Sequence, residues 1–214
     1  MSIFDQYKLS GALRFLADFR TGSLVDTVNG TAPAIAGSPK LVRGRGGLSL
    51  NAPSAADMIS YGSGANYDLT DAGTIVTVFR VPAAALVYLT GKFDFGAGNF
   101  GYLLYQIAGV MVLALASGVG ARSDYALFLT NVPPHSLVHL SASWSASKIY
   151  ATMNGVPAAS QNVVDVSNSA GFAMRPINFS VAPEGVLFAA IMNVTTTDQE
   201  RAAIYDSWRL EGHV

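Results

Sequence analysis

The chain contains no cysteine and few charged residues, and each absence excludes a class of function. Without a thiol there is no disulfide, no thiolate metal site and no cysteine nucleophile. Charged residues make up 13% of the 214, about half of the ~25% that is usual in soluble domains. The 13 basic and 14 acidic side chains nearly cancel. This balance argues against nucleic acid or an acidic membrane as the main ligand.

Targeting and membrane-spanning segments are also missing from the sequence. The first fifteen residues lack the basic and then apolar run of a signal peptide. The most apolar stretch, 107–116, is far too short to cross a membrane. We therefore expect a soluble protein made in a cytoplasm. Because so few charged residues are available for the surface, either Ser, Thr, Asn and Gly form most of the solvent-exposed surface or a partner covers part of it.

The stretch 137–156 carries the clearest structural pattern. Apolar and polar residues alternate through 138–144, and the alternation returns after a short polar break. A period of two is typical of a strand with one buried and one solvated face. Asn154-Gly155 follows, and this dipeptide favours a type I′ hairpin turn because both residues tolerate positive φ. The stretch predicts an antiparallel sheet with Trp144 on its buried face.

Further strands are predicted at a spacing typical of an all-β domain. Residues 74–80 are rich in β-branched side chains and apolar on both faces, as in an inner strand of two stacked sheets. The segment 35–42 is loop or weak strand. The other predicted strands are 13–19, 48–50, 58–61, 86–95, 101–107, 110–116, 125–129, 162–166, 177–181 and 186–191. Strands at this spacing indicate a sandwich rather than βαβ units.

One helix is predicted near the end of the chain. Thr197 and Glu200 form a capping box, in which the threonine oxygen and the glutamate each satisfy an orphan backbone amide. Ile204, Tyr205 and Trp208 then share one face at helical spacing. We expect the helix to dock on the sandwich with Trp208 as its anchor. The predicted fold class is all-β, a two-sheet antiparallel β-sandwich with one short C-terminal helix.

Several segments match a known pattern of strands and turns. The pattern has six parts in chain order: an early strand, a D-x-x-G-N-like turn, a glycine-led strand, an F-T-I-x-x-W-V-like strand, a W-x-H-V-A-like hairpin ending in N-G, and a closing strand with a Ser/Thr-x-x-Glu helix. In this sequence the six parts match, in the same order, residues 13–19, 26–30, 46–50, 74–80, 137–155 and 186–208. Leu137 stands where the hairpin pattern has tryptophan. Together these segments resemble a laminin-G-like domain of the concanavalin A-like lectin/glucanase superfamily.

The resemblance covers residues 13–208 and is specific for the fold. It implies a concanavalin A-like jelly roll over residues 13–214, preceded by an N-terminal arm of residues 1–12. Its implication for activity is weak, because this fold hosts lectins, hydrolases and inert adhesion or coat modules. A hydrolase is considered only because the superfamily contains some.

Catalysis by paired carboxylates is not supported by the sequence. The hydrolase branch needs two acids on one strand face, in an E-x-D-x-E-like run. The chain has three glutamates, Glu184, Glu200 and Glu211, and no such run. Glu200 already has a structural role in the capping box. We therefore expect no catalytic residue and no enzyme activity.

Other motifs have simpler structural interpretations. The G-x-G-x-x-G match at 96–101 lies between two predicted strands, with no helix to offer its amino end to a phosphate, so a hairpin is predicted there. Asp57, Asp68 and Asp71 are scattered, and such aspartates are more often turn formers than calcium ligands. His139 is interpreted as a surface or partly buried histidine on the polar face of its strand. We expect no metal and no cofactor.

The first functional hypothesis is a non-enzymatic structural virion protein, a phage capsid decoration or stabilising protein. Isolated laminin-G-like chains of this kind resemble phage capsid-decorating or tail-associated modules. Ile3, Phe4 and Tyr7 of the arm, together with one sandwich edge, would dock on a major capsid protein or another virion protein. Repetition around a symmetric shell would let weak contacts add up.

The alternative is a carbohydrate-binding, lectin-like attachment module on a phage head or tail. Sugars are held by aromatic faces together with amide and carboxylate hydrogen bonds. Tyr61, Tyr67, Asn99 and Phe100 lie in predicted loops and offer these groups. These four residues form the candidate glycan site.

Overall fold

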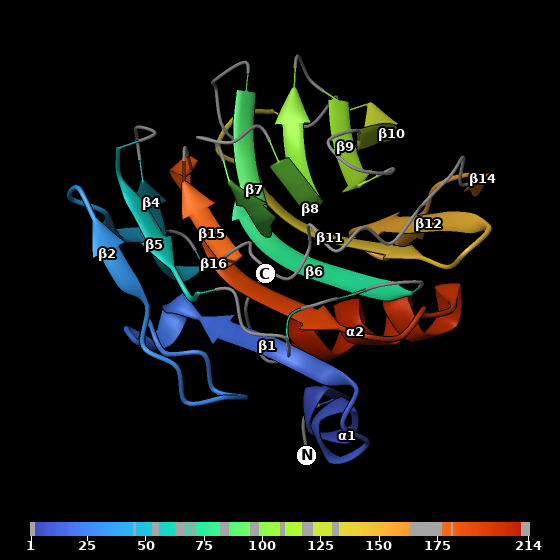
Figure 1. Ribbon diagram of the computed structural model, residues 1–214, viewed down its shortest axis with the longest axis horizontal. Coiled ribbons are helices and arrows are strands. Elements are labelled where there is room, and N and C mark those ends of the chain that lie inside the picture. Colours follow the sequence, from blue (N-terminus) through green and yellow to red (C-terminus); the bar gives the residue numbers. More distant parts are fainter. Residues whose placement is uncertain are drawn as a thin grey trace.

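The structure is a computed structural model that describes most of the chain. The residues it describes are 3–44, 46–52, 56–62, 67, 69, 72–81, 86–94, 99–107, 110–116, 122–129, 133–162, 177–180 and 182–210. Two antiparallel sheets stack on each other, and two helices lie on the outer face of one of them (Figure 1). The prediction of an all-β, two-sheet antiparallel sandwich is confirmed.

The larger sheet has nine strands in the order β13-β12-β11-β6-β16-β4-β3, with β1 added on β16 and β14 on β12. All of its pairings are antiparallel. Its strands are β1 (Leu13–Asp18), β3 (Lys40–Gly44), β4 (Gly47–Ala52), β6 (Gly73–Arg80), β11 (Leu137–Trp144), β12 (Lys148–Met153), β13 (Val156–Pro157), β14 (Gln161–Asn162) and β16 (Ala182–Met192).

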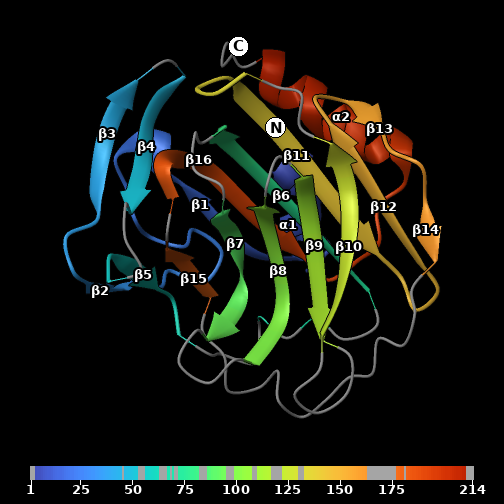
Figure 2. The ribbon, with the colours of Figure 1, turned by 90° about the horizontal axis from the view of Figure 1, so that it is seen from above.

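The smaller sheet has seven strands in the order β10-β9-β8-β7-β15-β5-β2, again antiparallel. Figure 2 shows β7 to β10 in front of the diagonal strands β6, β11 and β16 of the larger sheet. The strands are β2 (Ala34–Ala36), β5 (Met58–Ser60), β7 (Leu86–Asp94), β8 (Asn99–Ile107), β9 (Val110–Ala116), β10 (Arg122–Leu129) and β15 (Ile177–Ser180).

The stretch 137–156 forms the predicted hairpin, but both faces of β11 are buried, so the expectation of a solvated face is wrong. β11 pairs with β12 in a hairpin, and its other side pairs with β6. The turn residues Asn154 and Gly155 have φ of 50° and 78°, as a type I′ turn requires. Trp144 is 1% exposed and lies 5.8 Å from the ring of Tyr102 on the opposite sheet. The inward-facing alternate residues of both sheets thus form the main core.

The outer face of the nine-stranded sheet is covered by α1 (Ile3–Leu9) and α2 (Asp198–Trp208) (Figure 1). Apolar side chains of β6 and β16 form a second buried cluster there with Ile204 and Trp208 of α2. The predicted capping box is present, because Glu200 N donates to Thr197 Oγ1 and Thr197 N donates to Glu200 Oε2. No helix in the described part of the chain is long and apolar enough to cross a membrane.

Some boundaries differ from the sequence predictions. The segment 35–42, expected as loop or weak strand, contributes to two short edge strands, β2 and β3, whose side chains are mostly exposed and give little periodic signal. The strands on either side of the G-x-G-x-x-G match, β7 and β8, are antiparallel neighbours, and Asp94 of β7 pairs with Asn99 of β8. The hairpin interpretation of that motif is therefore confirmed. Of the predicted strand 162–166, residues 163–166 lie outside the described residues.

Candidate functional site

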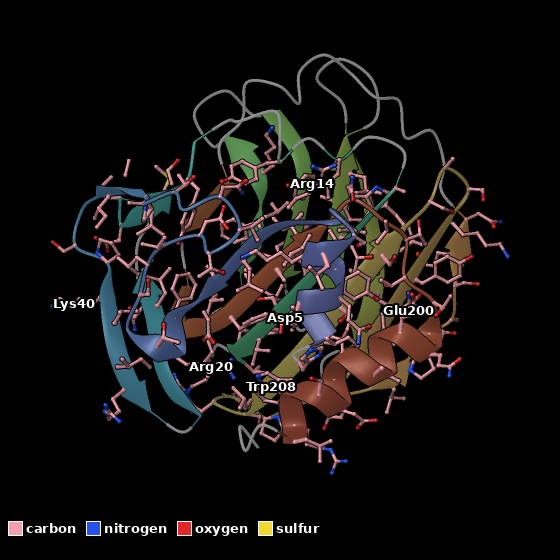
Figure 3. All side chains as sticks on the ribbon, turned by 90° about the horizontal axis from the view of Figure 1, so that it is seen from below. Asp5, Arg14, Arg20, Lys40, Glu200 and Trp208 are labelled. Carbon is pink, nitrogen blue, oxygen red and sulfur yellow. The ribbon has the colours of Figure 1, made fainter. Side chains whose placement is uncertain are left out.

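Helix α1 has a cavity on each side. It packs on the outer face of the nine-stranded sheet, next to α2, and the two cavities are lined by α1 together with different parts of α2. Figure 3 shows Arg20 and Trp208 toward one side of α1 and Glu200 toward the other. We call them the Arg20 cavity and the Glu200 cavity.

The Arg20 cavity has a volume of about 270 Å³. Leu16 and Phe188 contribute to its wall from β1 and β16. Its remaining lining side chains come from both helices, the end of β1 and the turn that follows β1, and they are Phe4, Asp5, Asp18, Arg20, Ser207 and Trp208. Aromatic, acidic, basic and hydroxyl groups therefore converge on one small space.

Arg20 is held in place by the turn that follows β1. Asp18 caps the short 3-10 helix Phe19–Thr21, and Gly22 ends that helix with a φ of 83°, which glycine adopts without strain. The Arg20 guanidinium donates to both carboxylate oxygens of Asp18, from Nε at 2.7 Å and from Nη2 at 2.6 Å. This two-point pair fixes the plane of the guanidinium.

The third guanidinium nitrogen of Arg20, Nη1, does not contact the Asp18 carboxylate through a hydrogen bond. Nη1 is buried and makes no hydrogen bond with any of the residues that the structure describes. The guanidinium carbon lies 5.7 Å from the ring centroid of Phe188, and the ring of Phe4 lies 5.1 Å from the same ring. One buried nitrogen with its N–H donors thus remains beside an aromatic wall, and buried donors are normally paired.

The Glu200 cavity is larger, about 390 Å³, and its wall is mostly exposed. It is lined by Ile3, Gln6, Tyr7, Ser10, Gln199, Glu200 and Ala203. Burial, with a contribution from the neighbouring Glu200 carboxylate, raises the pKa of Tyr7 above its ordinary value. Glu200 Oε2 already accepts hydrogen bonds from the backbone N and the hydroxyl of Thr197. Glu200, the carboxylate among the described lining residues, is therefore partly committed to the helix cap.

The side of α2 that faces the sheet covers a layer of polar residues. His139 is 1% exposed, and its ring lies 5.5 Å from the ring of Tyr205 and 5.8 Å from that of Trp208. Burial lowers its pKa to about 4. The expectation of a surface or partly buried histidine is corrected: His139 does lie on the polar face of β11, but α2 covers that face. Nearby, Ser143 and Thr74 share a hydrogen bond of 2.9 Å.

The predicted partner-binding residues Ile3, Phe4 and Tyr7 are not displayed outward. They lie on α1, are partly buried, and pack against the second core cluster of their own chain. Their spacing is that of an amphipathic helix, and the apolar side of this helix packs on the sandwich of the same chain. The expected arm thus contains a helix that packs on its own sandwich, and docking of these residues on a virion protein stays a prediction. Two of the three nevertheless line the Glu200 cavity, and Phe4 lines the Arg20 cavity.

The structure does not bring the predicted glycan-binding residues together on the surface. Tyr61 and Tyr67 are 4% and 3% exposed, and their rings pack edge-on against Phe15 in the main core. Each hydroxyl is engaged, Tyr61 with the carbonyl of Leu24 at 2.6 Å and Tyr67 with Asp26. Neither ring is open to a sugar in this structure, and a glycan site at these residues stays a prediction.

The other two residues of that predicted site cannot be placed by their side chains. Asn99 and Phe100 open β8, but their side chains lie outside the described part of the structure.

Buried carboxylates in the described part serve the fold. Asp26 is fully buried, and its carboxylate accepts hydrogen bonds from the backbone N of Leu16 and Val28, from Asn29 and from Tyr67. Burial raises the pKa of Tyr67 to about 12. Within the described ranges, no group of three or more His, Cys, Asp or Glu side chains is arranged to hold a metal. Asp57 accepts a hydrogen bond from the backbone N of Ser38, 19 residues earlier, so this bond joins two segments that are distant in sequence. Asp68 and Asp71 lie outside the described residues.

Sequence reasoning missed most of the Arg20 cavity. Asp5, Asp18, Arg20 and Ser207 carry no motif. Ser207 directly precedes Trp208 in α2, whereas the pairing of β1 with β16 and the contact of α1 with α2 bring the other three to the same cavity. One local signal was present. Asp18 and Arg20 are two residues apart at the end of a strand, before Gly22, and this pattern is compatible with an ion pair across a tight turn.

Comparison with protein-family models and with curated proteins finds no match to this sequence. Solved structures do resemble the fold. The binding domain of Paraclostridial Mosquitocidal Protein 1 has a TM-score of 0.73 at 16% identity over 95% of this chain and 53% of that chain. A botulinum neurotoxin type C structure, from work on cell entry that depends on interaction with two ganglioside molecules, has a TM-score of 0.73 at 12% identity over 96% of this chain and 53% of that chain.

A third structure is the binding domain of botulinum neurotoxin DC in complex with SialylT, with a TM-score of 0.70 at 12% identity over 92% of this chain and 52% of that chain. The chain spans about half the length of the structures it matches. At these identities the likeness concerns the fold. The chain has the β-sandwich, jelly-roll fold found in part of these toxin binding domains.

Proposed function

We propose that the chain is a non-catalytic binding module that attaches to another macromolecule. The observation that carries this proposal is the pair of cavities beside α1, where hydrogen-bonding and aromatic side chains converge. Neither cavity has a histidine or a cysteine among its described lining residues. The resemblance to toxin binding domains supports the same view, because those domains attach rather than catalyse.

A carbohydrate is the first candidate ligand. The Arg20 cavity offers aromatic rings, carboxylates and a hydroxyl, which are the groups that hold sugars. Relatives in fold interact with gangliosides or are complexed with SialylT. A glycan array probed with the intact chain, with calcium and with a chelator, tests this proposal. Binding in both conditions supports it, and an array without any signal contradicts it.

The second candidate is a place on a phage capsid or another virion surface. β2 and β3 each end a sheet at the same side of the sandwich (Figure 2), and they expose Ile35 by 58% and Val42 by 42%. Open strand edges with apolar side chains favour pairing with another chain. The low share of charged residues in the sequence, 13%, supports the same proposal.

The virion proposal has its own test. Mass spectrometry of purified particles from the source of this gene should detect the chain in a fixed ratio to the major shell protein. Purified shells should also bind the added protein, and Ile35→Lys with Val42→Lys should weaken that binding because charge blocks an edge. Particles that lack the chain would contradict the proposal.

A further inference from the structure

We propose that the outer edge of β3 binds an extended acidic segment of a partner protein, which adds to the larger sheet as a further strand. This inference rests on the second candidate of the proposed function, in which an open strand edge pairs with another protein chain. It assigns that pairing to one edge of the sandwich and defines the charge of the partner.

The first argument is the backbone of β3. The strand ends the larger sheet, and among the described residues it pairs only with β4. Figure 2 shows β3 as the outermost strand on its side of the molecule. In an antiparallel ladder, alternate residues direct their N–H and C=O groups away from the neighbouring strand. On β3 these groups form a row to which an added strand can pair.

The second argument is that β3 is exposed and yet held in place. Lys40, Val42, Arg43 and Gly44 are exposed. Leu41 is half-buried and packs against the main core, which fixes the strand on the sandwich. Every residue of β3 also pairs in register with β4. An added strand therefore meets a preformed template, and little ordering of this chain opposes binding.

The third argument is the charge of the edge. Lys40 and Arg43 are exposed, and no described residue forms an ion pair with either. Their side chains lie on opposite faces of the strand, because one is at an even and the other at an odd position. Their neighbours on β4, residues 47–51, carry no charge. The guanidinium of Arg80 also lies beside Gly44, where an added Cβ would be 2.7 Å from Arg80 Nη2. The edge is thus basic on both faces.

A second copy of this edge does not suit that charge. Two β3 strands paired antiparallel about Val42 would place Arg43 of each copy opposite Leu41 of the other, so the two Arg43 side chains would be diagonal neighbours on one face. Like charges on paired strands are destabilising, and a lysine on an edge strand is one way in which proteins prevent self-pairing. An acidic strand instead forms opposite-charge pairs on both faces.

The positions of the two cations define the sequence of the partner segment. In an antiparallel pair, one acidic residue faces Arg43, the next residue of the partner is apolar and faces Val42, and a second acidic residue faces Lys40. The segment therefore reads acid-apolar-x-acid along its own chain. With an apolar residue at x, the same sequence also fits a parallel pair.

The experiment measures binding of a fluorescent peptide with the core Thr-Glu-Val-Val-Glu-Thr to the intact chain by fluorescence anisotropy. One control peptide carries lysine in place of both glutamates. A second carries N-methyl groups on both valines; because one of two consecutive residues directs its N–H toward β3, this removes a hydrogen bond of the new ladder.

Two variants of the chain complete the design. Lys40→Glu with Arg43→Glu reverses the charge of the edge. The matched control, Lys8→Glu with Lys148→Glu, changes the net charge equally at two exposed positions on α1 and β12. Circular dichroism checks that each variant is folded.

We expect the wild type to bind the acidic peptide at least about tenfold more tightly than either control peptide. Lys40→Glu with Arg43→Glu should reverse the preference toward the lysine peptide, whereas Lys8→Glu with Lys148→Glu should keep the wild-type preference. Higher salt should narrow the difference between the acidic and the lysine peptide.

Four results would each overturn this assignment: no binding of any peptide, equal binding of the acidic and lysine peptides, an unchanged preference after charge reversal of the edge, or tighter binding of a single-stranded RNA oligomer than of the acidic peptide. The proposed function would still stand in each case. It fails separately, if the intact chain binds neither glycans nor purified shells.

Discussion

Acidification from pH 7 to pH 5 is expected to weaken the fold through His139. This side chain is 1% exposed beneath α2, and its ring lies against Tyr205 and Trp208. Its backbone N donates to Asn154 Oδ1 at 2.9 Å, which fixes β11 against the end of the β12 hairpin. No described residue hydrogen-bonds to its Nδ1. Protonation would therefore place a charge where little can solvate it.

The sign of the effect follows from the two pKa values. Burial lowers the pKa of His139 to about 4 in the folded chain, whereas an unfolded histidine titrates near 6.5. Between these values the unfolded state binds more protons, so the free energy of unfolding falls as the pH falls. The stabilisation is complete above pH ~6.5 and lost below pH ~4. The loss amounts to about 2 kcal/mol at pH 5 and about 3 kcal/mol at the acid limit.

Urea unfolding at pH 7 and pH 5, followed by circular dichroism, measures this loss. In His139→Gln the drop in unfolding free energy between the two pH values should be about 2 kcal/mol smaller than in the wild type. His135→Asn is the matched control, because His135 is exposed and has a φ of 67°, which asparagine tolerates. It should keep the full wild-type drop. An equal drop in His139→Gln and the wild type would refute the reasoning.

Three further changes test the main structural supports, each by urea unfolding at pH 7. Thr197→Ala removes the cap of α2 and should cost about 1 kcal/mol, whereas Thr197→Ser should cost less than half of that; equal losses would contradict the capping role. Asp26→Asn disturbs a buried acceptor of four hydrogen bonds and should cost about 3 kcal/mol, more than Tyr67→Phe at about 1 kcal/mol. Trp144→Ala should cost about 3–5 kcal/mol, and a loss below 1 kcal/mol would place its ring outside the core.

The fold could be predicted because its strongest signals are local. The period-two pattern of 137–153 sets which side chains face inward, and Asn154-Gly155 sets the register of the hairpin. The capping box of Thr197 and Glu200 is equally local, since its hydrogen bonds join residues three apart. Such features depend only on residues close together in sequence, so they can be predicted without knowing how distant segments pack.

The candidate site could not be predicted because its determinants are far apart in the chain. Tyr67 bonds to Asp26 across 41 residues, and this contact places a tyrosine from a polar sequence segment in the core. Arg20 meets Phe188 only because β1 pairs with β16. An alternating pattern shows that a face is apolar or polar. It does not show which helix later covers that face, as His139 illustrates.

The segment that forms α1 cannot pack on its own sandwich and dock on a shell protein at the same time. Phe4 packs on Phe188, at 5.1 Å between ring centroids, and also lines the Arg20 cavity. An arm that left the sandwich to dock on a shell would lose this contact and open the cavity.

Phe4→Ala should therefore cost about 1–2 kcal/mol of unfolding free energy, measured in urea, because it removes a partly buried ring and its aromatic contact. Leu9→Ala is the control, since Leu9 is 79% exposed and its loss should change the free energy by less than about 0.5 kcal/mol. If Phe4→Ala were as neutral as Leu9→Ala, α1 would be undocked in solution, and the arm would be free for a shell partner.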